Sequence, residues 1–150
     1  MTTRRIVKTA TFPPGSKPWM LRVSPDGKEV WVQADGNSTN VVLNADDLST
    51  LATMPCGKDP VRNGWSPDAS KSLVLNAGDA FAQLFDARTR RELGRLTVGP
   101  GASNVGFTKD GRTAFVVVTA ADAIAVVDMV RIEVVDQLKA GRQPQGLIIR

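Results

Sequence analysis

The sequence repeats with a period of 42 residues, and this period limits the possible folds more than any other feature. Glycine begins each repeat, at Gly15, Gly57, Gly99 and Gly141. The stretch SPDG that starts at Ser24 recurs 42 residues later as SPDA and then as TKDG, with no insertion between copies. A period in this range indicates neighbouring copies of one small structural unit.

Each unit contains four short extended runs separated by turn residues. In the first unit the runs cover residues 19–23, 29–33, 40–44 and 51–54. They favour Val, Leu, Trp and Phe, and several alternate apolar with polar residues, which is typical of strands. Ser-Pro-Asp-Gly suits a type I turn between the first two runs. Four strands per unit at this period predict an all-β fold made of β-propeller blades of four antiparallel strands.

The blades are predicted at residues 15–56, 57–98 and 99–140, within a single domain that covers 1–150. Alignment of the repeats places a lone strand at Ile6–Phe12, within 1–14, which corresponds to the last strand of a preceding blade. It places another at Gln145–Ile149, within 141–150, which corresponds to the first strand of a following blade. Propellers close with 4–8 blades. We therefore expect completion in trans, by self-association or by another propeller segment, or else membership of a longer propeller.

The repeat resembles the YVTN family of bacterial β-propellers. The matching elements are Gly-x-x-Pro, a short strand, Ser-Pro-Asp-Gly, an apolar strand and a strand ending in Val-x-Asp. The block that names the family aligns with residues 30–34, 72–76 and 114–118, and of these only Asn76 keeps the Asn. The resemblance implies a propeller fold and a periplasmic or extracellular location, although we expect no signal peptide in this chain. Some similar propellers carry haem ligated by His, and others are lactonases.

Composition argues against several classes of function. The 150 residues contain no His, which removes the usual general base near neutral pH and the usual zinc and haem ligand. Cys56 is the single cysteine and is expected to pack as a small apolar residue. The net charge of +4 is spread along the chain, so we expect no nucleic-acid surface. The longest apolar stretch, residues 114–130, is interrupted by Asp122 and Asp128, so no membrane span is expected.

A functional site is expected where the repeats differ. Asp26 recurs as Asp68 and Asp110, which indicates a structural role in each turn. In a four-stranded meander, the loops after the second and fourth strands share one face, called here the loop face. It carries Lys17, Lys58 and Arg142 from one set of loops, Asp35, Asn37, Asp79 and Asp122 from the other, and the adjacent Trp19. Such a face suits a small polar or anionic ligand. No metal, cofactor or catalytic set is predicted.

Two functions remain open on this basis. The first is a non-enzymatic binding or scaffold module, favoured by the lack of His and of a catalytic constellation. The second is part of a lactonase-like or other ligand-processing propeller, in which the acids and bases of the loop face would act. Fold alone does not separate them.

Overall fold

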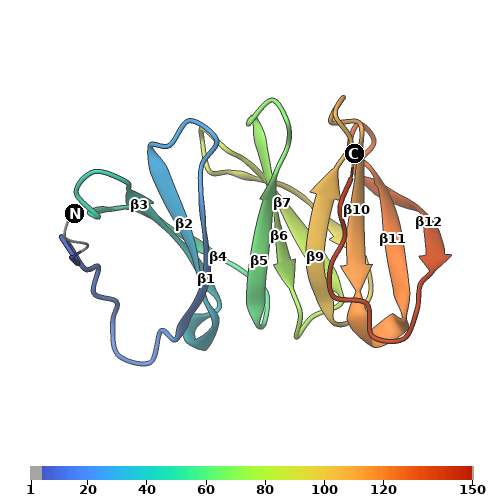
Figure 1. Cartoon of the computed structure of the whole chain (residues 1–150), viewed down its shortest axis with the longest axis horizontal. Helices are drawn as coiled ribbons and strands as arrows, with labels where there is room; N and C mark the ends of the chain where they lie inside the picture. The colour runs from blue at the N-terminus through green and yellow to red at the C-terminus, as the bar shows by residue number, and fades with distance from the viewer. Residues whose placement is uncertain (1–4, 150) are drawn as a thin grey trace.

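The computed structural model describes residues 5–149, which form three four-stranded antiparallel sheets in a row (Figure 1). The first sheet contains β1 (Pro18–Val23), β2 (Glu29–Ala34), β3 (Thr39–Asn44) and β4 (Thr50–Pro55). The second contains β5 (Pro60–Trp65), β6 (Lys71–Asn76), β7 (Phe81–Asp86) and β8 (Glu92–Thr97). The third contains β9 (Ala102–Phe107), β10 (Thr113–Val118), β11 (Ala123–Asp128) and β12 (Glu133–Lys139). Strands pair in sequence order within each sheet, as the prediction of propeller blades requires.

Helical structure is confined to two short 3₁₀ turns, η1 (Asp35–Asn37) and η2 (Thr119–Ala121), among the described residues. Each follows the second strand of its sheet. In residues 5–149 no helix has the length and apolar character needed to cross a membrane.

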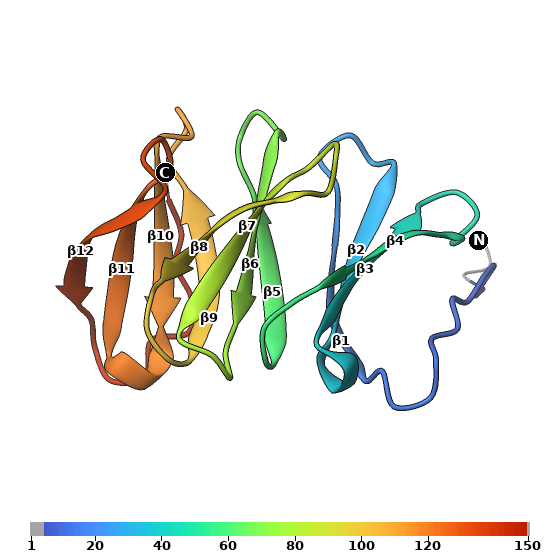
Figure 2. The same cartoon turned by 180° about the vertical axis from the view of Figure 1, so that it is seen from behind.

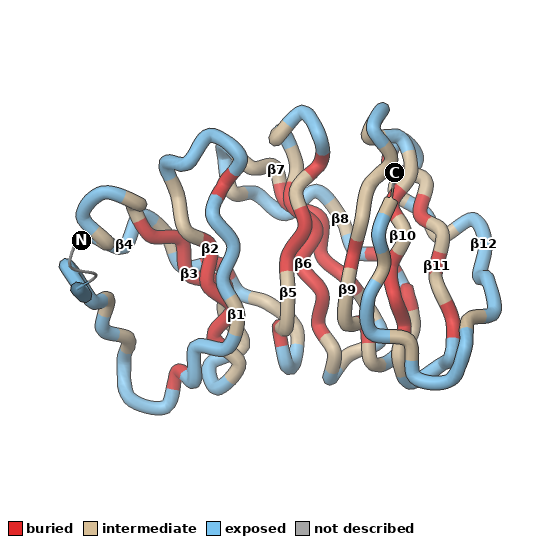
Figure 3. Tube along the Cα trace, viewed as in Figure 1, coloured by how far each residue is buried: buried red, intermediate tan, exposed pale blue. Residues whose placement is uncertain are grey.

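The middle strands are apolar on both faces because sheets stack against one another. In β2 and β3, Trp31 pairs with Val42 and faces the second sheet, while Val32 pairs with Val41 on the opposite face. Figure 3 shows buried residues concentrated along these central strands. Strands that are buried on both faces carry apolar residues at consecutive positions. This explains why several of the predicted runs are almost entirely apolar.

Hydrophobic contacts join each sheet to the next. Between the first two sheets, Trp31 meets Trp65 edge to face, with ring centroids 4.8 Å apart and planes at 72°. Between the second and third sheets a larger cluster includes Leu73, Leu84 and Val116. Trp31 is fully buried, with zero exposure.

The 42-residue period is a property of the backbone as well as of the sequence. Lys17, Asp59, Gly101 and Gln143 occupy equivalent loop positions and all have positive φ, between 45° and 75°. Left-handed backbone is unfavourable for most L residues. The loops therefore keep one geometry even where side chains differ.

The two predicted lone strands are corrected by the structure. Residues 6–12 and 145–149 form no strand. A strand requires hydrogen-bonding neighbours, and among residues 5–149 no further strands lie beside these two segments to complete their blades. Ala10 and Phe12 instead pack against the outer face of the first sheet. Figure 2 shows the two terminal segments at opposite ends of the row.

Candidate functional site

The repeated aspartate of the first hairpin turn has a structural role. The Ser24 hydroxyl donates a hydrogen bond of 2.6 Å to the Asp26 carboxylate, and the Lys28 amide donates another of 3.1 Å. Asp68 and Asp110 accept the equivalent pairs of bonds in the next two hairpins. These bonds lower the pKa of Asp26. The carboxylates are committed to the turns, as the sequence predicted.

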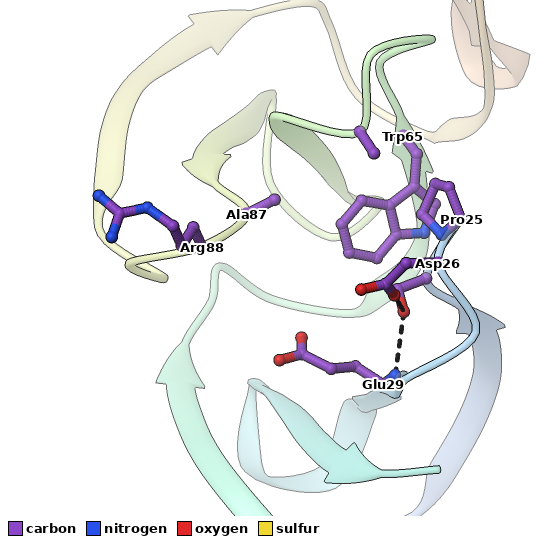
Figure 4. A pocket seen from close by; sticks show the side chains of 8 residues that line it. Pro25, Asp26, Glu29, Trp65, Ala87 and Arg88 are labelled. Atoms are coloured by element: carbon purple, nitrogen blue, oxygen red, sulfur yellow. Dashed lines mark hydrogen bonds between the residues drawn. The ribbon is translucent and has the colours of Figure 1, made fainter.

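A pocket of about 250 Å³ lies on this turn side, between the first and second sheets. Figure 4 shows Asp26, Glu29 and Trp65 at its wall. Glu29 is already engaged, since it accepts a 2.8 Å bond from the Trp31 indole and forms an ion pair with Arg90. The carboxylates of this pocket therefore hold turns and neighbouring strands together, and leave no free acid for chemistry.

On the loop face, the two sets of loops are in contact. The Asp35 amide donates to the Lys17 carbonyl at 3.1 Å. The carboxylates of Asp79 and Asp122 accept backbone bonds of 2.7 Å from Lys58 and Gln143, respectively. These two aspartates therefore fasten one loop to another.

The other predicted loop-face residues differ in how far they are fixed. Asn37 donates a 2.9 Å bond to the Ser16 hydroxyl, which also ties two loops together. The side chains of Lys17, Lys58 and Arg142 are exposed. A partner or ligand on this face would therefore contact mainly Lys17, Lys58 and Arg142.

Sequence reasoning missed one acid on this face. The facing carboxyl of Asp35, followed by burial, raises the pKa of Asp59. Asp59 could not be found from the repeat, because its equivalents are Lys17, Gly101 and Gln143. Within residues 5–149, no group of three or more acidic or sulfur ligands is arranged to hold a metal ion.

A second cavity follows the first strands of the three sheets, and we call it the axial groove. It has a volume of about 430 Å³. Its wall includes Trp19 and Met20 from β1, Val61 and Arg62 from β5, and Ser103 from β9. Trp19 alone among the predicted site residues lines this groove, with 71% of its surface exposed.

The polar groups of the axial groove were not predicted. The Nη1 atom of Arg62 donates a 3.3 Å hydrogen bond to the amide oxygen of Asn104. The hydroxyls of Ser103 and Thr119 are 2.7 Å apart, and Thr119 also donates to the Pro144 carbonyl at 2.7 Å. The sequence could have indicated these groups through the variation between repeats on the first strand of each blade, where Arg62 aligns with Met20 and Asn104.

Cys56 behaves as the sequence analysis expected. Burial, together with the charge of Glu92, raises the pKa of its thiol to about 12. A thiol that stays protonated is a poor nucleophile. Its environment therefore argues for packing and against covalent chemistry.

No family model and no curated protein matches the sequence. Solved structures do resemble it. Hydrazine synthase from Kuenenia stuttgartiensis is 22% identical with a TM-score of 0.82, over 95% of this chain and 41% of that chain. The periplasmic gluconolactonase of Pseudomonas aeruginosa is 22% identical with a TM-score of 0.75, over 91% and 43% of the two chains. The WD40 repeats of RRP9 are 14% identical with a TM-score of 0.73, over 82% and 38%.

The fold and these similarities define the chain as an array of β-propeller blades. It spans about two fifths of the length of each of the three similar structures. At these identities the likeness concerns the fold alone.

Proposed function

We propose that this chain is a non-enzymatic binding or scaffold module of the YVTN type, with blades at 15–56, 57–98 and 99–140, completed in trans by a second copy of itself. The observation that carries the proposal is the exposure of apolar side chains on the outer faces of the two end sheets. Equivalent positions in the interior of the row are covered by a neighbouring sheet.

The outer face of the first sheet is covered over β2 and β3, where Ala10 and Phe12 pack, but is exposed at β1. Leu21 is 57% exposed, whereas its repeat equivalents Asn63 and Val105 are 0% and 8% exposed. In the second and third sheets, the preceding sheet covers this position. Burial of Leu21 to the same extent would remove apolar surface from water and favour association.

The third sheet presents the complementary face at β12. Leu138 is 44% exposed, whereas its equivalents Leu96 and Met54 are 2% and 4% exposed. The middle strand β11 alternates between buried and half-buried residues, while the equivalent β7 is buried along its centre. Met54 in the first sheet and Leu96 in the second are covered by the sheet that follows each of them.

A second copy is a suitable occupant because each chain carries both faces. Inside the row, the face containing the Leu138 position always packs against the face containing the Leu21 position. Two copies joined head to tail would repeat this contact twice, and head-to-tail contacts form a ring when their rotation closes. The exposed Lys17, Lys58 and Arg142 would then surround one opening of that ring.

Light scattering on the purified 150-residue chain tests the proposal. We expect twice the chain mass of 16.1 kDa. The substitutions Leu21→Lys and Leu138→Lys should each give monomers, because each places a charge in both junctions. Val130→Lys is the matched control, since Val130 is 67% exposed in the turn between β11 and β12 and belongs to neither strand.

Mixing the two monomeric variants sharpens the test. A head-to-tail dimer of one copy of each has one unaltered junction, so mixing should restore part of the dimer. A contact between identical faces predicts no such rescue. A folded wild-type monomer at high concentration would overturn the proposal, as would capture of a different propeller chain in place of a second copy.

A lactonase-like enzyme is the alternative, and the likeness to a gluconolactonase is the observation that favours it. On this alternative, Asp35, Asp79 and Asp122 would provide acid or base groups. Two of these carboxylates already accept loop amides, which favours the binding module. Hydrolysis of a sugar-acid lactone above background by the purified chain would reverse this preference.

A further inference from the structure

The axial groove combines residues from all three sheets. β1, β5 and β9 lie side by side along it, and the segment after β12 contributes Gln145. Its volume of about 430 Å³ falls in the range of small-molecule sites. Trp19, Arg62 and Ser103 lie on strands of the three sheets, so these lining groups are held in place.

Arg62 carries a positive charge in this groove without an acidic partner. Among residues 5–149, no carboxylate lies within ion-pair distance of its guanidinium. Its one side-chain bond goes to the neutral amide of Asn104. By contrast, Arg90, which is also partly buried, is paired with Glu29.

A second arginine increases the positive potential. Burial, followed by the like charge of Arg22 on the adjacent β1, lowers the pKa of Arg62. A bound anion would relieve both effects, because it replaces lost hydration and screens the two cations from each other. Guanidinium groups suit oxyanions because they donate two parallel hydrogen bonds.

The rest of the groove offers hydroxyls and apolar surface beside this charge. The Ser103 and Thr119 hydroxyls form a hydrogen-bonded pair on the wall. Trp19, Met20 and Val61 provide an apolar surface. An exposed indole ring stacks well against a flat or ring-shaped group.

We propose that the axial groove binds a small organic oxyanion, with Arg62 holding the anionic group and Trp19 packing against the ring or apolar part of the ligand. All the groove residues come from one copy of the chain. The site is therefore independent of the trans completion proposed above, and the two proposals can fail separately.

Isothermal titration calorimetry with three matched probes tests the site. Benzoate and phenyl phosphate carry the anionic group on one ring, and benzyl alcohol carries the same ring without the charge. We expect both anions to bind with a Kd of about 1 mM or tighter, and benzyl alcohol to bind at least about tenfold more weakly. The ratio between the two anions distinguishes a carboxylate ligand from a phosphate ligand. No anion binding, or equal binding of benzyl alcohol, would overturn the proposal.

Variants of the chain locate the bound probe. Arg62→Gln should weaken binding of both anions by about tenfold or more, and Arg62→Lys should weaken it less, since the charge remains. Trp19→Ala should weaken the ring-bearing anions more than acetate or inorganic phosphate. Arg91→Gln is the matched control, because Arg91 is exposed and lies outside the groove lining.

Two further measurements separate the site from folding and association. Each variant is compared by thermal unfolding, so that lost affinity in a folded Arg62→Gln protein counts for the proposal. Benzoate should bind the Leu138→Lys variant as tightly as the wild type. Unchanged affinity in Arg62→Gln would overturn the assignment of the anion to Arg62.

Discussion

Gly64 in β5 lies at the contact between the second sheet and β9 of the third. A Cβ atom added there would stand 2.5 Å from Cγ1 of Val105 and 3.1 Å from Cε2 of Phe107. Val105 is 8% exposed and belongs to the cluster that joins the two sheets. Gly64→Ala should therefore strain the contact between the two sheets.

The expected cost follows from this geometry. A contact of 2.5 Å forces Val105 or the strand itself to move. Overpacking of a close-packed core costs about 1–3 kcal/mol. In a domain of this size each kcal/mol lowers Tm by about 2–4 °C, so the predicted fall in Tm is about 2–12 °C.

Thermal and urea unfolding of the wild type and four variants tests this reasoning. Gly141→Ala is the matched control, because nothing lies within 4 Å of a Cβ atom at that position. The double variant Gly64→Ala with Val105→Ala removes the clashing methyl. It should be less destabilised than the sum of its two single variants by about 0.5 kcal/mol or more. Additive effects, or equal effects of Gly64→Ala and Gly141→Ala, would refute the steric explanation.

Two further predictions concern the hairpin turns. Ala69 has a φ of +58°, and the equivalent residues Gly27 and Gly111 have +75° and +68°. Ala69→Gly should raise the free energy of unfolding by about 0.5 kcal/mol, because relief of the left-handed strain, about 1–2 kcal/mol, exceeds the entropy cost of the added glycine. A lower urea midpoint for Ala69→Gly would contradict this. The Ser66 hydroxyl, followed by the Ser70 amide, lowers the pKa of Asp68 from 3.8 to about 2. Since the pKa of Asp68 is lower in the folded state, the stability that its ionised carboxylate contributes is present above about pH 4 and is lost as the pH falls towards 2. The urea midpoint of Asp68→Asn should therefore depend less on pH in that window. An unchanged pH profile would count against the hydrogen bond from Ser66.

The sequence determined the repeating parts of this protein. The strand bounds agree with the predicted runs to within about one residue, and the turn role of Asp26 is confirmed by its bonds. These features are local, because each blade forms its ladders and turns from residues close together in the chain. A local rule that is written three times can be found by comparing the copies.

Tertiary structure decided the features that depend on how blades lie side by side. Arg62 and Ser103 line one groove from different sheets, and Asp35 meets Asp59 across a sheet boundary. The segments at 6–12 and 145–149 have strand-like sequences, yet they form no strands without neighbouring strands to pair with. Hydrogen-bond pairing and close packing between blades depend on which residues are close in space, and these residues are far apart in the chain. The repeat therefore specifies each blade, while the arrangement of the blades creates the groove, the paired acids and the exposed apolar positions of the end sheets.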